Sequence, residues 1–265
     1  MNNLRGLVVV ICSLYLGAVD ANQSKIDVWE TLLKPKYFPD TVFNEAGSVI
    51  ELRTPYRAED ASVTPVSITA KFPQTDRRFI EKIYMFVDEN PQPLVGVFYL
   101  TPSMGRADLA MRVRIDKYTN VRAVAVLNSG EHHIVSNFVK AQGGCSAPLA
   151  ADFATAMENI GVMKFRLLGE INPDDTVVGQ FMLSHPNVTG MQKDQKTQLI
   201  RPAHYVKTVK IFFNDEHVLT AETGFSISAD PSFRFFFRPH GGGELRAEVS
   251  DSKGNAWTQT FAVDA

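Results

Sequence analysis

The thiol of Cys145 is the side chain best placed for chemistry. It lies in the segment KAQGGCSAP, directly after Gly143 and Gly144. The chain has two cysteines, and Cys12 lies in an N-terminal apolar stretch typical of an export signal. Once that stretch is removed, Cys145 has no partner for an internal disulfide. Because glycine makes the backbone flexible and allows close approach, we predict a presented, reactive thiol on a glycine hinge.

The surroundings of this thiol favour a carrier over a catalyst. Catalytic cysteines need a group that lowers the thiol pKa, and the sequence places no such group beside Cys145. Lys140, five residues away, could act only if the segment folded back. A carrier needs reach instead, and five extended residues span on the order of 15 Å.

The other candidate sites are weaker. His132 and His133 lie at a predicted hairpin tip, and one of them could bind a metal with Cys145, but no second convergent ligand is evident. His185, between Ser184 and Pro186, indicates a turn or interface residue and not a catalytic triad. Three further patterns are assigned to structure: the glycines at 241–243 to a turn, the sequon at 187–189 to an unused site, and Phe233, Phe235 and Phe237 to the core. We therefore expect no catalytic residue, no metal site and no bound cofactor.

Composition and the N-terminus define the compartment. Hydrophobic residues make up 45% and charged residues 21%, as in globular proteins, and the formal net charge is -2. No basic cluster is present, so we expect neither nucleic acid nor a membrane surface as a partner. Residues 1–21 combine Arg5, an apolar run and small residues before Asn22, which predicts a cleaved signal peptide and a periplasmic protein.

Hydrophobic periodicity predicts an all-β chain. Residues 26–33 have helical spacing and are followed by Pro35 and Pro39, which we expect to end the helix. After them, apolar residues alternate or cluster in short runs, as in strands. The predicted strands are 66–72, 83–87, 95–100, 109–115, 121–127 and 134–139, then 165–168, 177–184, 206–213, 218–222, 233–238, 244–250 and 256–263.

The strand pattern lapses between the two series. Residues 141–163 lack alternation, and Asp152 could cap a short helical turn that ends near Gly161. We therefore predict two immunoglobulin-like antiparallel β-sandwiches in tandem, joined by a flexible arm. The predicted parts are the signal at 1–21, a first sandwich at 22–140 with a short N-terminal helix, a cysteine-bearing arm at 141–163 and a second sandwich at 164–265.

The order of several motifs resembles the SoxYZ sulfur carriers, in the single-chain form called quinoprotein dehydrogenase-associated SoxYZ-like carrier. The first half resembles SoxY in the segments 55–61, 87–91, 118–123 and 138–145. The second half resembles SoxZ in the segments 179–186, 189–191, 226–231 and 233–238.

The resemblance implies a function as well as a fold. It implies that Cys145 is the attachment site for sulfur intermediates, with Gly143 and Gly144 as its hinge, and that the protein is not an enzyme. The implied partners are periplasmic sulfur-oxidising enzymes and cytochromes, or a quinoprotein dehydrogenase system. A usual SoxY ends shortly after its cysteine, whereas here the chain continues through Pro148, so the thiol is expected on a tethered loop. The alternative is an accessory module that docks on a quinoprotein or cytochrome, with Cys145 incidental.

Overall fold

The protein is described by a computed structural model covering residues 27–149, 153–169, 176–239 and 241–264. The predicted signal peptide and Cys12 lie outside these residues, as does Asp152. Within them, no helix is both long and apolar enough to cross a membrane.

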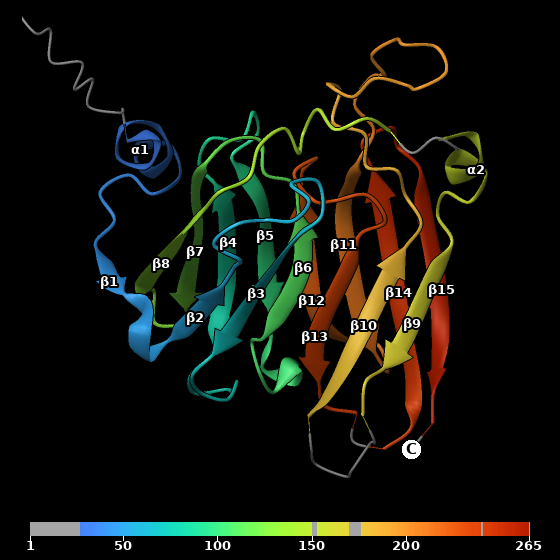
Figure 1. The fold of residues 1–265 in the computed structure, drawn as a ribbon. Helices are drawn as coiled ribbons and strands as arrows, with labels where there is room; N and C mark the ends of the chain where they lie inside the picture. Colours follow the sequence, from blue (N-terminus) through green and yellow to red (C-terminus); the bar gives the residue numbers. More distant parts are fainter. Residues whose placement is uncertain (1–26, 150–152, 170–175, 240, 265) are drawn as a thin grey trace, which may run out of the picture.

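Two β-sheets form the molecule (Figure 1), which confirms the predicted antiparallel sandwich class. The first half contributes β1 (Phe43–Glu45), β2 (Ile50–Arg53), β3 (Thr64–Ala70), β4 (Ile80–Val87), β5 (Leu94–Leu100), β6 (Leu109–Val113), β7 (Thr119–Leu127) and β8 (His132–Val139). The second half contributes β9 (Met163–Leu167), β10 (Val177–Leu183), β11 (Val206–Phe213), β12 (Glu216–Thr223), β13 (Ser232–Phe237), β14 (Gly243–Asp251) and β15 (Ala256–Val263).

Strands of the two halves pair with each other. One sheet has nine strands in the order β1-β8-β7-β4-β5-β12-β11-β14-β15, and the other has six in the order β2-β3-β6-β13-β10-β9. The halves meet at β5 and β12, where Leu100 pairs with Leu219, and at β6 and β13, where Leu109 pairs with Phe235. In Figure 1 the blue-to-green strands therefore continue into the yellow-to-red strands. The two predicted sandwiches share both sheets.

The core between the sheets runs through both halves. Alternating residues of β13 enter it, and Phe233, Phe235 and Phe237 are all buried there, as predicted. Phe98 of the first half packs against Phe233 of the second. One apolar core therefore holds both halves together, since burial of aromatic surface is the largest favourable contribution of each such residue.

Helices are few and short. A π-helical turn at Trp29–Leu33 continues into α1 (Lys34–Tyr37), and 3-10 turns lie at Ala46–Ser48 and Pro102–Met104. Of the two prolines expected to end the helix, Pro35 lies within it, and the helix ends at Tyr37, before Pro39. Lys34 donates its N–H to the Trp29 carbonyl oxygen and Phe38 donates to that of Lys34, so these two turns close without an N–H from Pro35. Trp29 packs there on Phe86.

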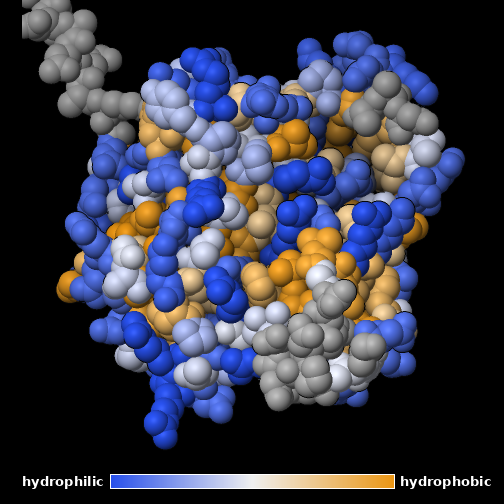
Figure 2. Space-filling model, turned by 60° about the horizontal axis from the view of Figure 1, so that its bottom comes forward, coloured by the Kyte–Doolittle hydropathy of each residue, from blue (hydrophilic) through white to orange (hydrophobic). Residues whose placement is uncertain are grey.

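The segment between the two strand series closes one end of the sandwich. Residues 140–149, here called the cysteine segment, run along the upper edge in Figure 1 from β8 toward the second half. The predicted helical turn is α2 (Phe153–Glu158). The lower end, brought forward in Figure 2, shows hydrophilic residues over much of its surface with hydrophobic residues grouped between them.

Candidate functional site

The cysteine segment lies against the end of β6 and the residues that follow it. Gly143 donates its N–H to the carbonyl oxygen of Asp116 at 2.9 Å, and Gly144 donates to that of Ile115 at 2.9 Å. Asn90 fixes the same stretch, because its side chain accepts the Asp116 N–H at 2.8 Å and donates to the Arg114 carbonyl at 2.8 Å. These contacts hold the segment along residues 114–116.

The two glycines permit close packing here. Gly143 has a φ of 77°, in the left-handed region that glycine adopts without strain. A Cβ on Gly144 would lie 2.1 Å from the Ala61 carbonyl oxygen and 2.6 Å from that of Ile115. In this conformation Gly144 is needed for close approach of two backbones. Its predicted role as a hinge stays a prediction.

Residues of the second half hold the backbone around Cys145. The Thr189 hydroxyl donates to the Cys145 carbonyl oxygen at 2.6 Å, and the Gln192 side chain donates to the Ala147 carbonyl at 2.8 Å. From the first half, the Asp116 carboxylate accepts the Cys145 N–H at 3.3 Å. The segment is therefore hydrogen-bonded to both halves, which agrees with a tethered loop, and its predicted flexibility stays a prediction.

The thiol of Cys145 is enclosed. The residue is 0% exposed, whereas a presented thiol was expected. Burial raises the pKa of Cys145 to about 12, the Asp116 carboxylate adds to the increase, and Arg114 opposes it. At neutral pH the enclosed group is thus a protonated thiol, and the thiolate is the form that reacts. Chemistry at Cys145 requires the segment to move.

Arg114 is a site residue that sequence reasoning missed. It falls at an outward position of the alternating stretch 109–115, so it was expected to face solvent. However, β6 ends at Val113, and the cysteine segment covers the next residue. Arg114 is 2% exposed and donates to the carbonyl oxygens of Gly144 and Asn187, both at 3.3 Å. The burial of Arg114 depends on a segment that is distant in sequence from the strand, so no local pattern around Arg114 predicts its role.

The loop after β10 forms the other wall of the site. Asn187 is buried with a φ of 45°; its side chain donates to the Ile227 carbonyl at 3.0 Å and accepts the Val206 N–H at 2.9 Å. The sequon asparagine thus lies inside the fold, and its lack of use stays a prediction. His185 accepts the Asn187 backbone N–H on Nδ1 at 3.0 Å, which fixes the start of the loop. The loop then presents the Asn187 carbonyl to Arg114 and Thr189 to the cysteine segment.

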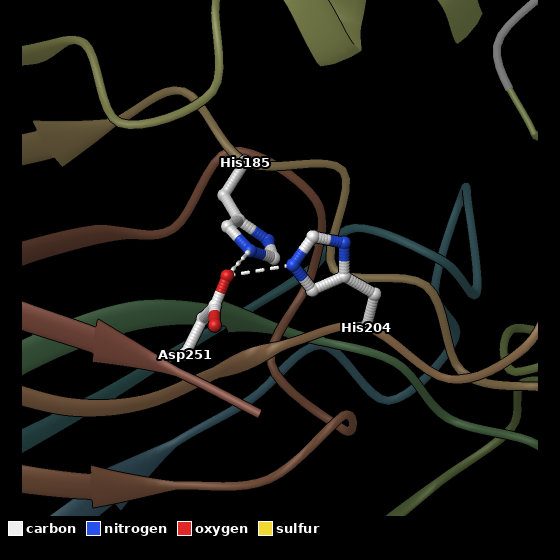
Figure 3. A group of neighbouring side chains, drawn as sticks. All are labelled: His185, His204 and Asp251. Carbon is white, nitrogen blue, oxygen red and sulfur yellow. Dashed lines mark hydrogen bonds and ion pairs between the residues drawn. The ribbon is translucent and has the colours of Figure 1, made fainter. Parts of the chain in front are cut away.

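His185 belongs to a buried cluster with His204 and Asp251 (Figure 3). The Nε2 atoms of His204 and His185 lie 2.6 Å and 3.6 Å from Oδ2 of Asp251. Burial lowers the pKa of His185 to about 4, with His204 contributing and Asp251 opposing. Burial alone would raise the pKa of Asp251, but hydrogen bonds from Asn255 and His204 hold it at about 2. His185 is thus neutral beside a carboxylate.

This cluster is the group of described residues with the geometry to hold a metal ion, because its three ligand atoms lie within 4.8 Å of one another. The hydrogen bonds fit a metal poorly. His185 accepts an N–H on Nδ1, so its own proton is on Nε2, the atom that faces Asp251. Both Asp251 oxygens already accept hydrogen bonds from Asn255. The arrangement is a buried polar cluster in which Asp251 bonds His204 and Asn255, while Nε2 of His185 lies 3.6 Å from Asp251 without a hydrogen bond.

The structure does not bring the predicted histidine pair to Cys145. His132 and His133 begin β8, and the cysteine segment follows the other end of that strand. Seven residues of strand span about 23 Å. The hypothesis of a metal shared between these histidines and Cys145 is therefore wrong.

A groove lies on the outer face of the six-stranded sheet, across the junction of the halves. Its volume is about 830 Å³, and its lining includes the cations of Arg53, Arg112, Lys164 and Arg234 and the carboxylate of Asp230. The lining residues come from both halves, so the groove depends on the pairing of β6 with β13.

Two family models match the chain in succession. The model of the sulfur oxidation protein SoxY matches residues 35–145, and that of the sulphur oxidation protein SoxZ matches residues 166–262. The chain therefore belongs to the SoxYZ-like proteins, with the SoxY and SoxZ parts fused. The family supports a carrier-type role in sulfur oxidation.

Solved structures give weaker similarities. The sulfur carrier protein SoxY from Chlorobium limicola f thiosulfatophilum is 23% identical, with a TM-score of 0.35, over 41% of this chain and 88% of that one. A putative superoxide reductase from Thermotoga maritima is 15% identical, with a TM-score of 0.31, over 38% and 92%. A β-glycosidase from Bacteroides vulgatus is 8% identical, with a TM-score of 0.25, over 82% and 24%. No curated protein was found to match the chain.

Proposed function

We propose that this protein is a covalent carrier, which holds a sulfur-containing group on Cys145 while separate enzymes process it. The observation that carries the proposal is the position of the family match. The SoxY match ends at residue 145, which is the cysteine, and the SoxZ match follows in the same chain. Cys145 is also the free cysteine among the described residues. The protein supplies a thiol and leaves the chemistry to its partners.

Loading requires the cysteine segment to open. The thiol is enclosed, but the segment is held by individual hydrogen bonds, and each contributes about 1 kcal/mol net. A minor open population is therefore accessible by local unfolding, without loss of the sandwich core. Once open, the thiol leaves its low-dielectric surroundings and its pKa returns toward the ordinary range. Opening thus exposes and activates the same group.

A balanced loading step can be written for thiosulfate. A bond forms between Sγ of Cys145 and the outer sulfur of thiosulfate, and the thiol proton passes to solvent. Two electrons leave to an acceptor, which we assign to a redox partner such as a cytochrome. The product is a Cys145 thiosulfonate that bears a negative charge.

Intact-mass spectrometry tests the proposal. The protein is incubated with thiosulfate and the sulfur-oxidising partner enzymes, without reductant, beside the matched variant Cys145→Ala. We expect the wild type to gain the mass of a thiosulfonate that a reductant removes, and the variant to gain nothing. An unchanged wild-type mass would reject the carrier function.

A second candidate is an accessory module with Cys145 incidental. The enclosed thiol, with its pKa raised to about 12, favours it. The docking face would then be the groove with its excess of cations, which suits an acidic partner surface. An oxidation assay in cells separates the candidates. Full activity of Cys145→Ala supports the module, and loss of activity supports the carrier.

The partners and the compartment are part of the proposal. We infer a periplasmic protein that meets sulfur-oxidising enzymes and cytochromes, or a quinoprotein dehydrogenase system. Membership of the SoxYZ-like family supports this inference. Cell fractionation checks the compartment, and recovery of the protein only in the cytoplasm would contradict it.

A further inference from the structure

Arg114 is a buried cation that lacks an ionic partner. Its side chain is 2% exposed and reaches two carbonyl oxygens, those of Gly144 and Asn187, both at 3.3 Å. Its Nε is buried without a hydrogen-bond partner. No ion pair joins its guanidinium to a carboxylate of the described residues, and Asp60 acts on it only at longer range. The Arg114 guanidinium, which is the strongest hydrogen-bond donor of the site, therefore makes fewer hydrogen bonds than it can.

This arrangement is energetically unfavourable for the Arg114 cation. A buried charge without a counter-ion has a large desolvation cost, and two long hydrogen bonds to carbonyls offset it only in part. Burial accordingly lowers the pKa of Arg114. An oxygen-bearing anion would give the guanidinium the charge-assisted hydrogen bonds that it prefers.

Cys145 places its cargo beside this cation. Arg114 bonds the carbonyl of the preceding residue, Gly144, and interacts electrostatically with Cys145 itself. The other charged group facing the thiol is Asp116, which opposes a negative charge. A thiolate, without oxygen acceptors, gains too little from Arg114 to overcome burial and Asp116. A group with oxygen acceptors beyond the sulfur would engage the guanidinium directly.

We propose that Arg114 is the binding group for an anionic, oxygen-bearing cargo on Cys145, such as a sulfonate. This inference rests on the proposed function, because it assumes Cys145 as the attachment site. The loaded segment then closes over Arg114 and shields the adduct, whereas an uncharged cargo receives no such contact. The site thereby selects cargo by charge.

Two adducts of equal size test this inference without partner enzymes. Iodoacetate and iodoacetamide both alkylate the thiolate: the S–C bond forms, iodide leaves, and the thiol proton passes to solvent. One adduct ends in a carboxylate and the other in a neutral amide. After complete labelling, confirmed by mass, we expect a melting temperature about 2–4 °C higher for the carboxymethyl protein.

Three variants test whether the difference in melting temperature between the two adducts depends on Arg114. Arg114→Gln should abolish it, and Arg114→Lys should keep part of it, because the cation remains without the planar fork. Arg112→Gln is the matched control. It removes the same charge two residues away, from an exposed side chain, and should leave the difference unchanged.

If Arg114→Gln fails to fold, the melting temperatures of the two wild-type adducts still test the inference. Equal melting temperatures of the two wild-type adducts, or a lower one for the carboxymethyl protein, would overturn the inference. The inference would also be overturned if Arg112→Gln lost the difference in melting temperature to the same extent as Arg114→Gln. Neither result affects the mass test of the carrier function, so the two proposals fail separately.

Discussion

The neutral state of His185 depends on its burial, and this makes the stability of the protein depend on pH. Its pKa is lowered from 6.5 to about 4 in the folded protein. The unfolded chain therefore binds a proton below pH 6.5 that the folded protein does not bind, so stability decreases as the pH falls from 6.5 toward 4. At about pH 5, this lowered pKa reduces the free energy of unfolding by about 2 kcal/mol relative to neutral pH.

The variant His185→Asn isolates this contribution, because the asparagine oxygen can still accept the Asn187 N–H. We expect urea unfolding of the wild type to lose about 2 kcal/mol more than the variant between about pH 6.5 and pH 5. Parallel pH profiles would show that His185 does not titrate as described.

Thr189 holds the segment that encloses the thiol. Its hydroxyl donates to the Cys145 carbonyl, and its removal costs the closed segment about 1 kcal/mol. We expect Thr189→Val to react about fivefold faster with a neutral disulfide reagent, because the open population increases. Thr260→Val, at an exposed position of β15, is the control and should react like the wild type. An unchanged rate in Thr189→Val would mean that opening does not involve this hydrogen bond.

Among single residues, the sequence predicted Cys145 as the candidate and Phe233, Phe235 and Phe237 as core. Both follow from local patterns: the lone cysteine after two glycines, and the two-residue period of a strand. Arg114 and Asp116 could not be identified in this way. Their roles depend on the segment that covers them, about 30 residues further along the chain.

At the level of elements, the cysteine segment is defined by close packing at Gly144. A Cβ there would lie 2.1 Å from the Ala61 carbonyl oxygen, so Gly144→Ala forces the two backbones apart. We expect a loss of about 1–3 kcal/mol in stability together with faster modification of Cys145. Gly47→Ala is the matched control, since nothing lies within 4 Å of its Cβ. A stable Gly144→Ala protein with an unreactive thiol would contradict this packing.

Most strands were predicted from periodicity, and their ends differ by a few residues. The short strands β1 and β2 were missed, because three or four residues are too few to establish a period. The pairing of β5 with β12 was also missed. Edge pairing between distant strands leaves no local pattern in either one, so the two sandwiches looked separate in sequence.

At the level of the whole molecule, the shared sheets predict one cooperative unit. The chain has two tryptophans, Trp29 in the first half and Trp257 in the second. Variants that keep a single tryptophan, Trp257→Phe and Trp29→Phe, report on one half each. We expect each variant to show the same unfolding midpoint by tryptophan fluorescence and by circular dichroism, because β5–β12 and β6–β13 pairing couples the halves. A fluorescence midpoint well apart from that of circular dichroism would indicate independently folding halves.

Fusion also fixes the site geometrically. Its walls come from both halves: residues 114–116 from one, and Asn187 and Thr189 from the other. Because one chain supplies both, the pairing is intramolecular and does not depend on protein concentration. Opening of the cysteine segment, as the proposed function requires, would leave the pairing of the sheets intact.

The most direct measurement is the mass of the protein purified without reductant from cells that are actively oxidising sulfur compounds, with peptide mapping of Cys145. We predict a sulfur-containing adduct on Cys145 that a reductant removes. An unmodified thiol in all molecules from such cells would contradict the account.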